Sequence, residues 1–309
     1  TGIGNGLDNL ITGNSLGNLL QGVDGNDTLA GGGGNDTLDG GTGTNTLDFS
    51  AAPGAVDINF AAGIAAQNGF GGHDSLLNLQ VAIGTGFADE FESSLSGGDT
   101  LVGGGGNDIY WVMAAGVSIQ ENPGEGIDTI YSQLASYTLS ANVENLTLFR
   151  SAVGGTGNEL DNVVTGNAGN NLLDGAGGND TLSGGGGNDT LLGGAGNNSL
   201  DGGTGTDTAD YSAAAGPINL NFAARVVSQN GFGGQDGISN TELAIGTGFD
   251  DTFESSFGAS TLAGGSGNDT YWIMAAGTSV VEGSGGGTDK EASCIPSLTL
   301  ADNVEQLVL

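Results

Sequence analysis

The chain has 309 residues, of which 64 are glycine, and its formal net charge is −33. The chain has 36 acidic residues and only 3 lysines and arginines. Nucleic acid and anionic membranes are therefore excluded as partners, because both need a basic patch. A multivalent cation is the expected counter-charge. The irregular glycine spacing with 4 prolines excludes collagen, and a single cysteine excludes an intrachain disulfide framework.

The first predicted elements are short strands in a nine-residue repeat. Nonapeptides occupy residues 4–48, with Asp or Asn at the sixth position and an apolar residue at the eighth. Glycines at the first, second and fourth positions suit a tight turn that needs φ > 0. The triplet that follows predicts a strand with one inward side chain. A less glycine-rich insert covers 49–83, nonapeptides return over 84–131, and linking rungs cover 132–153.

A second copy repeats this order later in the chain. Residues 6–36 match residues 159–189 at an offset of 153. This copy contains nonapeptides over 157–210, an insert over 211–245, further nonapeptides over 246–292 and end rungs over 293–309. We therefore predict two domains, residues 1–153 and residues 154–309, each of which is one copy of the repeat array.

The spacing of the repeats predicts the fold. A turn of six residues and a strand of three make half a coil, so two nonapeptides, or 18 residues, complete one coil. Loops 18 residues apart then stack on the same edge, at the strand spacing of about 4.8 Å. The predicted fold class is all-β: a parallel β-roll, or β-solenoid, in two tandem copies.

Stacked loops bring carboxylates of neighbouring coils within reach of one ion. The sequence supplies the pairs Asp189/Asp207 and Asp251/Asp269, and also Asp89/Asp108, whose spacing is longer by one because Ser93 is an extra residue. A relaxed shell of about six to eight oxygens fits Ca²⁺ better than Mg²⁺. One histidine and one cysteine argue against zinc and copper.

We therefore expect several Ca²⁺ ions. The predicted ligands are the sixth-position aspartates Asp27, Asp36, Asp89, Asp99, Asp108, Asp128, Asp180, Asp189, Asp207, Asp251, Asp269 and Asp289. Weaker candidates carry a neutral amide at this position, namely Asn9, Asn18, Asn45, Asn162, Asn171 and Asn198. Backbone carbonyls of loop glycines would complete the shell, with Gly32, Gly34, Gly104, Gly106, Gly185, Gly187, Gly265 and Gly267 as candidates.

The best matches to the pattern G-G-x-G-x-D-x-U-x are the units at 31–38, 103–110, 184–191 and 264–271. They resemble the haemolysin-type, or RTX, calcium-binding nonapeptide repeat, a motif for which Ca²⁺ binding is generally known. Residues 137–148 resemble the linking rungs of long RTX proteins. The resemblance implies a parallel β-roll, calcium-driven folding after secretion, and often export by a type I system.

Catalytic interpretations are weaker. Gly13-Asn14-Ser15-Leu16-Gly17 matches the G-x-S-x-G nucleophile elbow, but it lies in the nonapeptide register and His73 is the single histidine. A metalloprotease H-E-x-x-H motif is excluded for the same reason. We expect no enzyme within these residues. Recurring acidic pairs favour further ligands or solvated edges over a glycosidase site: Asp74/Asp236, Asp48/Asp210, Glu92/Glu254, Glu121/Glu282 and Glu144/Glu305.

Three further positions carry expectations of their own. Tyr110 and Tyr271 take the inward leucine position, and the tryptophan after each points outward, where it covers a neighbouring rung or binds a sugar. Lys290 and Glu291 follow the last predicted ligand, Asp289. Because a charge at an inward position is costly, Glu291 predicts a poorly formed final unit.

The composition also predicts a mechanism. A net charge of −33 with few large apolar residues does not sustain a compact calcium-free state, so calcium supplies the folding free energy. Extracellular sites bind at about 10⁻⁴–10⁻³ M, so the chain would fold outside the cell, secreted or on the cell surface. No signal-peptide pattern opens the sequence and no apolar run is long enough for a transmembrane segment.

Two roles remain open at this point. The duplication favours a structural repeat protein in a surface layer, adhesin or filament, which self-associates end to end as a homo-oligomer. The alternative is a calcium-dependent secretion and folding module of a larger secreted enzyme, such as a protease, lipase or epimerase, or of a toxin.

Overall fold

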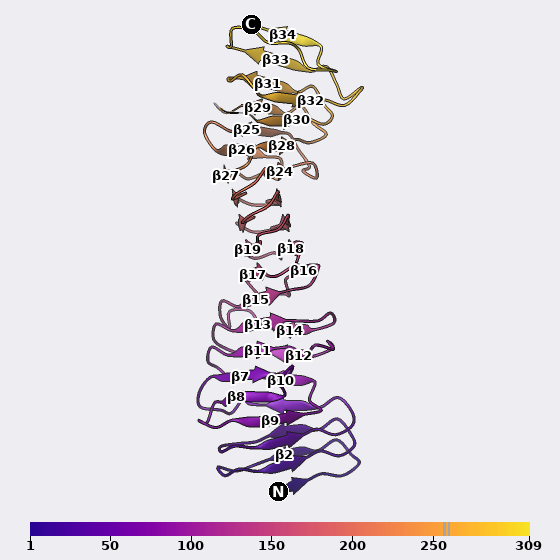
Figure 1. Ribbon diagram of the computed structural model, residues 1–309, viewed down its shortest axis with the longest axis vertical. Helices are drawn as coiled ribbons and strands as arrows, with labels where there is room; N and C mark the ends of the chain where they lie inside the picture. The colour runs from indigo at the N-terminus through magenta and orange to yellow at the C-terminus, as the bar shows by residue number, and fades with distance from the viewer. Residues whose placement is uncertain (256–257, 259) are drawn as a thin grey trace. The chain divides into compact units, whose positions relative to one another are not determined.

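The computed structural model describes residues 1–255, 258 and 260–309. Throughout these residues the secondary structure is short β-strands, and no helix is present among them (Figure 1). The chain forms two compact units. Unit 1 comprises Thr1–Leu134 and Leu139–Asn145, and unit 2 comprises Ala135–Thr138 and Leu146–Leu309. The predicted all-β fold class is confirmed.

The strands of unit 1 precede those of unit 2 along the chain, and Asn145 of β17 is the one strand residue of unit 1 that follows a unit 2 strand. Unit 1 contains β1 (Gly2–Ile3), β2 (Leu10–Thr12), β3 (Leu19–Gln21), β4 (Thr28–Ala30), β5 (Thr37–Asp39), β6 (Thr46–Asp48), β7 (Val56–Asn59), β8 (Ile64–Asn68), β9 (Asp74–Leu77), β10 (Val81–Ile83), β11 (Glu90–Glu92), β12 (Thr100–Val102), β13 (Ile109–Val112), β14 (Ser118–Gln120) and β15 (Thr129–Ser132).

Unit 2 has the same kinds of strand. They are β16 (Ser136–Thr138), most of β17 (Asn145–Leu148), β18 (Gly154–Thr156), β19 (Val163–Thr165), β20 (Leu172–Asp174), β21 (Thr181–Ser183), β22 (Thr190–Leu192), β23 (Ser199–Asp201), β24 (Thr208–Asp210), β25 (Ile218–Asn221), β26 (Val226–Asn230), β27 (Asp236–Ser239), β28 (Leu243–Ile245), β29 (Thr252–Glu254), β30 (Thr261–Ala263), β31 (Thr270–Ile273), β32 (Ser279–Val281), β33 (Lys290–Ser293) and β34 (Gln306–Val308).

Strand pairing follows the predicted 18-residue coil. In unit 1, β2 pairs in parallel with β4, with Leu10 opposite Thr28, and β3 pairs in parallel with β5, with Leu19 opposite Thr37. In unit 2, β21 and β23 pair in the same way. Alternate strands along the chain therefore belong to two different sheets, and each unit is a parallel β-solenoid.

The core of each unit is a column of eighth-position side chains. Leu29, Leu38 and Leu47 are fully buried, while their strand neighbours are half-buried. Removing a leucine side chain of this size from water stabilises the fold by about 1.5–3 kcal/mol. One inward residue in three is enough because each strand is only three residues long.

Aromatic residues continue this column. Tyr110 and Tyr271 are fully buried, as predicted, and Tyr110 stacks on Phe91 with ring centroids 5.2 Å apart. Trp111 lies outside the core and stacks on Tyr131 of the next coil, with centroids 4.3 Å apart. The tryptophan therefore covers a neighbouring rung.

Among the strand pairs of the described residues, neighbouring strands run antiparallel within the inserts. In unit 1, β8 pairs antiparallel with both β7 and β9, while β9 continues the parallel stack on β5 and β7 continues it on β11. Strands β25, β26 and β27 repeat this arrangement in unit 2. Each insert thus adds a strand between two coils without breaking the sheet.

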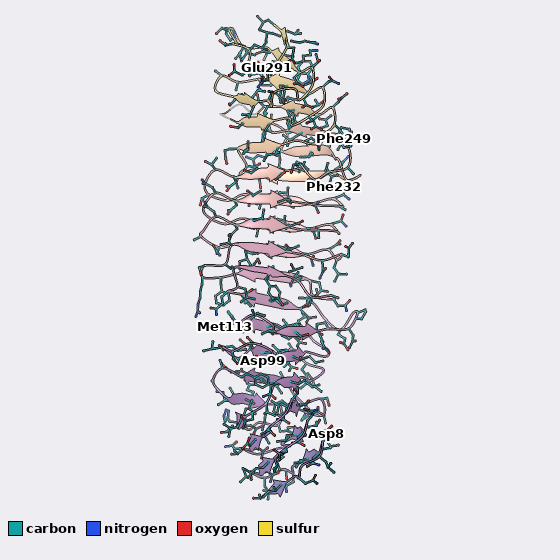
Figure 2. The ribbon with its side chains drawn as sticks, turned by 90° about the vertical axis from the view of Figure 1, so that its right-hand side faces the viewer. Asp8, Asp99, Met113, Phe232, Phe249 and Glu291 are labelled. Carbon is teal, nitrogen blue, oxygen red and sulfur yellow. The ribbon has the colours of Figure 1, made fainter. Side chains whose placement is uncertain are left out.

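The final unit forms despite its charged inward residue. Strand β33 pairs in parallel with β31, with Glu291 opposite Tyr271, and Glu291, labelled in Figure 2, is buried. Its Oε1 accepts the backbone N–H of Ala301 at 3.1 Å. The expectation of a poorly formed unit is therefore wrong. Burial raises the pKa of the Glu291 carboxyl, because an apolar surrounding disfavours its charged form.

No helix in the described residues has the length and apolar character needed to cross a membrane.

Candidate calcium sites

The loops use their glycines for two different purposes. Second- and fourth-position glycines have positive φ, as at Gly32 (φ 82°) and Gly34 (φ 99°), where side chains are rarely tolerated. The first-position glycine, Gly31, does not have positive φ, so the expectation was wrong for that position. A Cβ on Gly31 would instead collide with Oδ2 of Asp36. The first glycine is needed for the space that the carboxylate occupies.

The sixth-position side chains form a ladder between coils. The backbone N–H of Asp189 donates to Oδ1 of Asp207 at 2.7 Å, and the N–H of Asp251 donates to Oδ1 of Asp269 at 2.7 Å. Across the 19-residue spacing, the N–H of Asp89 donates to Oδ1 of Asp108 at 2.7 Å. All three predicted pairs are therefore brought together, and each uses one carboxylate oxygen to satisfy the preceding loop.

Asparagine fills the ladder position without leaving an oxygen free. Oδ1 of Asn45 accepts the N–H of Asp27 at 2.9 Å, and Oδ1 of Asn198 accepts the N–H of Asp180 at 2.9 Å. The Oδ1 atoms of Asn9, Asn18, Asn162 and Asn171 each accept an N–H of their own loop. Since an amide has one oxygen, these residues serve the loop structure first.

The second carboxylate oxygen is the distinctive feature of most predicted aspartates. Their side chains are at most 4% exposed. Their Oδ2 atoms are buried and have no hydrogen-bond partner in the described part of the chain at Asp27, Asp36, Asp108, Asp180, Asp189, Asp207, Asp269 and Asp289. A buried ionised oxygen without a partner is strongly unfavourable. A bound cation is the group that fits this arrangement.

The other predicted aspartates use their oxygens within the protein. The backbone N–H of Thr85 donates to Oδ2 of Asp89 at 2.6 Å, and Thr247 donates in the same way to Asp251. Ser94 donates to Oδ2 of Asp99 at 2.6 Å. Asp128 differs from these three: its Oδ1 makes the ladder bond, accepting the N–H of Asp108 at 2.8 Å. The predicted ligands therefore fall into two classes that their sequence positions do not separate.

A backbone carbonyl lies next to many of the free carboxylate oxygens. A Cβ on Gly22 would collide with Oδ2 of Asp27 and would lie 2.5 Å from the carbonyl oxygen of Gly40, one coil later. The same two groups converge at Gly175 and at Gly184. The carbonyl oxygens that lie beside the carboxylates thus belong to first-position glycines. These glycines were not among the ligands predicted from the sequence. Because the φ of these glycines is not positive, the loop needs them for space and not for backbone conformation.

The carbonyls nominated from the sequence are placed elsewhere in the loops. The carbonyl oxygen of Gly185 accepts the N–H of Thr204 at 2.9 Å, and that of Gly34 accepts Nδ2 of Asn68 at 2.8 Å. Their role as ligands stays a prediction.

Burial sets the electrostatics of these sites. It raises the pKa of Asp108, Asp180 and Asp269 to about 7 each, and repulsion from neighbouring carboxylates adds to the effect. It also raises the pKa of Asp36 and Asp189. Ionisation of these carboxyl groups is therefore unfavourable in the metal-free fold. A cation at the site would lower their pKa values again.

The inserts supply ladder residues that the nonapeptide pattern does not contain. Asp74 accepts the N–H of Asp36 at 2.8 Å, and Asp236 accepts the N–H of Asn198 at 2.9 Å. Both are buried, so neither is a solvated edge residue. The Tyr211 hydroxyl donates to Oδ2 of Asp236 at 3.0 Å, whereas Oδ2 of Asp74 has no partner among the described residues. The two inserts differ at this oxygen.

Glutamates continue the ladder beyond the last nonapeptides. Oε2 of Glu144 accepts the N–H of Asp128 at 2.9 Å, and Oε2 of Glu305 accepts the N–H of Asp289 at 2.8 Å. These recurring acids are structural partners of the loop backbone.

Comparison with known proteins supports a metal-binding reading of this geometry. The sequence profile of the RTX calcium-binding nonapeptide repeat matches residues 12–47, 94–112, 156–191, 175–209 and 245–272. These segments contain the loops with first-position glycines and buried aspartates described above. Proteins with this repeat bind calcium.

Two curated relatives share part of the repeat region. Endo-1,3-1,4-beta-glycanase ExsH of Rhizobium meliloti (strain 1021) is 48% identical over 65 residues, which are 21% of this chain and 14% of the relative. Endo-1,3-1,4-beta-glycanase EglC of the same organism is 37% identical over 66 residues, with the same two shares. The similarity therefore spans a small part of each glycanase.

Proposed function

We propose that this chain, a protein of the RTX calcium-binding nonapeptide repeat family, is a secreted protein whose coils fold when calcium binds between them. The observation that carries this proposal is the row of buried Oδ2 atoms without partners in the described residues, as at Asp27, Asp180 and Asp189. Each of these three lies beside a first-position carbonyl oxygen of the next coil.

The protein's own groups have separate tasks in this mechanism. Oδ1 of each aspartate ties its loop to the preceding coil, as Asp207 does to Asp189. Oδ2 and the first-position carbonyl supply oxygens to the ion, and the first glycine leaves the space for them. Calcium, when bound, supplies the positive charge that the sequence lacks. The ladder and the ion site therefore share one side chain, which couples binding to folding.

Charge explains why folding would wait for the extracellular medium. The net charge of −33 and the buried carboxylates oppose a compact metal-free state. Extracellular calcium modules bind at about 10⁻⁴–10⁻³ M, above cytosolic calcium. The chain would therefore stay unfolded until it is exported.

Circular dichroism with calcium and with excess chelator tests this proposal. We expect a β-sheet spectrum with calcium and a disordered spectrum without it, and readdition of calcium should restore the first. Magnesium at the same concentration is the control and should restore less, because its small octahedral shell suits these sites poorly. Full β-structure in the chelator would contradict calcium-driven folding.

For the biological role we favour a structural protein of a surface layer, adhesin or filament. The support is the duplication of the whole array, with the same order of rungs, insert and rungs in both units. Repeat proteins of this kind can associate end to end through their sheets. Sedimentation velocity with and without calcium is the measurement. We expect calcium-dependent species larger than a monomer. A monomer at all protein concentrations would contradict self-association.

A second role is favoured by the glycanase similarity. The matched segment is 14% of each relative, as expected if the repeats are an accessory calcium module of a larger secreted enzyme. The gene sequence on either side of these residues discriminates the two roles. A catalytic domain there supports the module, and further repeats support the structural protein.

We propose that the residues present here carry no catalytic site of their own. The supporting observation is that recurring acids such as Glu144 and Glu305 accept backbone N–H groups of the ladder. His73 is the single histidine, and its Nδ1 is hydrogen-bonded to the carbonyl oxygen of Ala66. Incubation of the calcium-bound chain with a 1,3-1,4-beta-glycan should release no reducing sugar, and measurable release would overturn this.

A further inference from the structure

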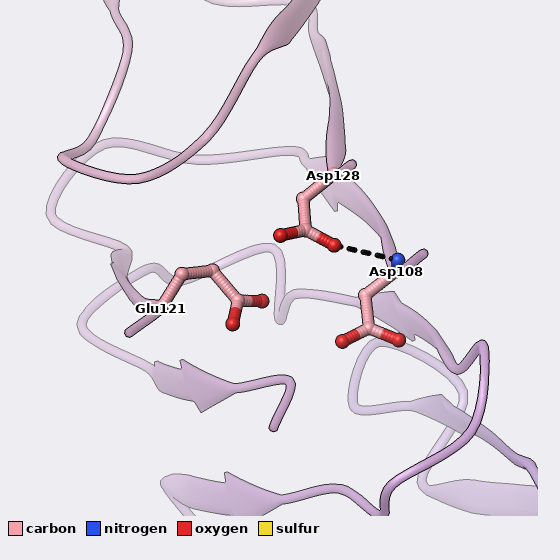
Figure 3. Close-up of side chains that lie close together, drawn as sticks. All are labelled: Asp108, Glu121 and Asp128. Carbon is pink, nitrogen blue, oxygen red and sulfur yellow. Dashed lines mark hydrogen bonds between the residues drawn. The ribbon is translucent and has the colours of Figure 1, made fainter. Parts of the chain in front are cut away.

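Each unit contains one cluster of three buried carboxylates. In unit 1 it comprises Asp108, Glu121 and Asp128, with one oxygen of each within 4.8 Å of the others (Figure 3). In unit 2 it comprises Asp269, Glu282 and Asp289, under the same limit. Figure 3 shows the Glu121 carboxylate directed toward the two aspartates. The two aspartates belong to the nonapeptide positions, but the glutamate does not.

The glutamate replaces a first-position glycine. Strands β12 and β14 pair with Val102 opposite Gln120, so Gly103 and Glu121 begin equivalent loops of successive coils. Strands β30 and β32 place Gly264 and Glu282 in the same relation. At Gly84, the neighbours of a Cβ are Oδ2 of Asp89 and the carbonyl of Gly103. At Gly103, they are the Tyr110 hydroxyl, Oδ2 of Asp108 and Oε1 of Glu121. A charged side-chain oxygen takes the place of a backbone carbonyl.

The free oxygens of this cluster are buried. Asp108 is 1% exposed and Glu121 is 8% exposed, and both Oδ2 of Asp108 and Oε2 of Glu121 have no hydrogen-bond partner within the described residues. Glu282 and Asp269 repeat this in unit 2. Three ionised carboxylates without basic partners at such depth are strongly unfavourable, and a bound cation would compensate their charge. The sequence holds only Arg150, Arg225 and Lys290 as basic side chains, and Lys290 Nζ lies over the Trp272 ring at 6.0 Å.

A tyrosine holds each glutamate in place. The Tyr110 hydroxyl donates to Oε1 of Glu121, and the Tyr271 hydroxyl donates to Oε1 of Glu282. Both tyrosines are fully buried and stack on a phenylalanine of the neighbouring coil. The ring is therefore fixed by packing, and the hydroxyl fixes the rotamer of the carboxylate. Tyrosine acts here as a positioning residue.

We propose that each cluster is a distinct cation site, formed by three carboxylates and a positioning tyrosine, that binds calcium more tightly than the nonapeptide sites. Affinity of calcium sites rises with the number of charged ligands and with rigidity. The nonapeptide sites combine one free carboxylate oxygen with a backbone carbonyl, whereas this site adds the charge of Glu121 or Glu282. It would take hard divalent ions and, more strongly, trivalent lanthanides. The inference rests on the proposed calcium-dependent fold.

Terbium titration tests the proposal, because Tyr110 and Tyr271 lie beside the sites and can sensitise terbium emission. In the unaltered 309-residue chain, we expect an early luminescent phase that corresponds to two ions. The double variant Glu121→Gln/Glu282→Gln should lose that phase, with affinity at these sites reduced by about tenfold or more. Glu159→Gln, an exposed residue of unit 2, is the control for a removed charge and should retain it.

Further measurements separate the possible failures. Circular dichroism at saturating calcium should show the same β-structure in the double glutamate variant as in the unaltered chain. The variant Tyr110→Phe/Tyr271→Phe keeps both carboxylates, and in it calcium should displace a bound lanthanide from these sites less effectively. An unchanged early phase in the glutamate variant would overturn the three-carboxylate site while leaving calcium-driven folding intact. Loss of all calcium-induced β-structure in the unaltered chain would instead contradict the proposed function.

Discussion

At the scale of single residues, each loop position has one physical task. The second and fourth glycines provide positive φ, the first provides space, and the sixth residue provides two oxygens with different partners. Asparagine can form the ladder but offers no second oxygen, so Asn45 supports the loop of Asp27 without adding charge. This division explains why both Asp and Asn occur at this position, including at the buried Asp27 and Asn45.

The first glycine gives a direct test of the ion site. Gly184→Ala would place a Cβ against Oδ2 of Asp189 and the carbonyl of Gly202, at a residue whose φ is ordinary. We expect weaker calcium binding and a loss of about 1–3 kcal/mol, as for other overpacked sites. Gly248→Ala is the matched control, since a Cβ there meets nothing within 4 Å in the described residues. Calorimetric calcium titration and chemical denaturation measure both effects, and equal behaviour of the two variants would refute the steric role.

The second loop position gives a test of backbone strain. Val23 occupies it with φ 88°, where neighbouring loops have Gly32 and Gly41. Because Val23 is 42% exposed, its side chain contributes little to the core. Val23→Gly should therefore stabilise the calcium-bound chain by about 1 kcal/mol, as left-handed strain is removed. Val163→Gly, an equally exposed strand residue, should destabilise it. Thermal unfolding in saturating calcium compares them.

At the scale of elements, the inserts show how the solenoid accepts extra chain. Strand β8 lies between β9 and β7, and the parallel stack continues on both sides. The insert also returns a ladder residue, Asp74 or Asp236, to the edge that the hairpin interrupts. The element is therefore compatible with the ion sites on either side of it.

Tyr211 is the residue that distinguishes the two inserts. Its hydroxyl supplies the partner of the buried Asp236 Oδ2, and Phe49 takes the corresponding sequence position in unit 1 without a hydroxyl. Tyr211→Phe should destabilise unit 2 by about 1–3 kcal/mol, because a buried acceptor loses its donor. Tyr131→Phe, which retains its stacking on Trp111, should have a small effect. Denaturation in calcium would reject this interpretation if both variants unfold alike.

At the scale of the whole molecule, charge controls the balance between folded and unfolded chain. Solenoid stability is a sum over coils and their interfaces, so on the proposed function each ion would stabilise its own neighbourhood, and the ions together would determine whether the array forms. The net charge of −33 makes this dependence strong. On the proposed function, calcium would act as a structural component of every coil with a free Oδ2.

The raised pKa values predict opposite pH responses with and without calcium. Burial raises the pKa of Asp108, Asp180 and Asp269 to about 7 and that of Asp74 to about 6, above the unfolded value of about 3.9. Their stabilising contribution to the metal-free fold is full below pH of about 4 and is lost as pH rises through about 7. The calcium-free chain should therefore gain β-structure on acidification.

With calcium, protons compete for the same carboxylates, so affinity should fall as the pH drops below about 7. Circular dichroism and calcium titration between pH 4 and pH 8, with ionic strength held constant as the control, measure both responses. A calcium-free chain equally disordered at both ends of this range would contradict the first expectation.

The sequence by itself determined the features that repeat at the period of the coil, within one coil or between two successive coils. The nine-residue period sets the loop and strand, and the 18-residue coil places Asp189 below Asp207, because these contacts are local in a solenoid. Only the tertiary structure decided which aspartates have a free oxygen, since Thr85 and Thr247 satisfy two of them through loop geometry. It also decided the contacts that depend on irregular coils. Asp74 reaches Asp36 only because the hairpin is inserted between the coils, and Glu121 reaches Asp108 only because β14 pairs in register with β12. A periodic pattern predicts contacts at its own period, whereas contacts across an insertion depend on how the backbone hydrogen bonds are completed around it.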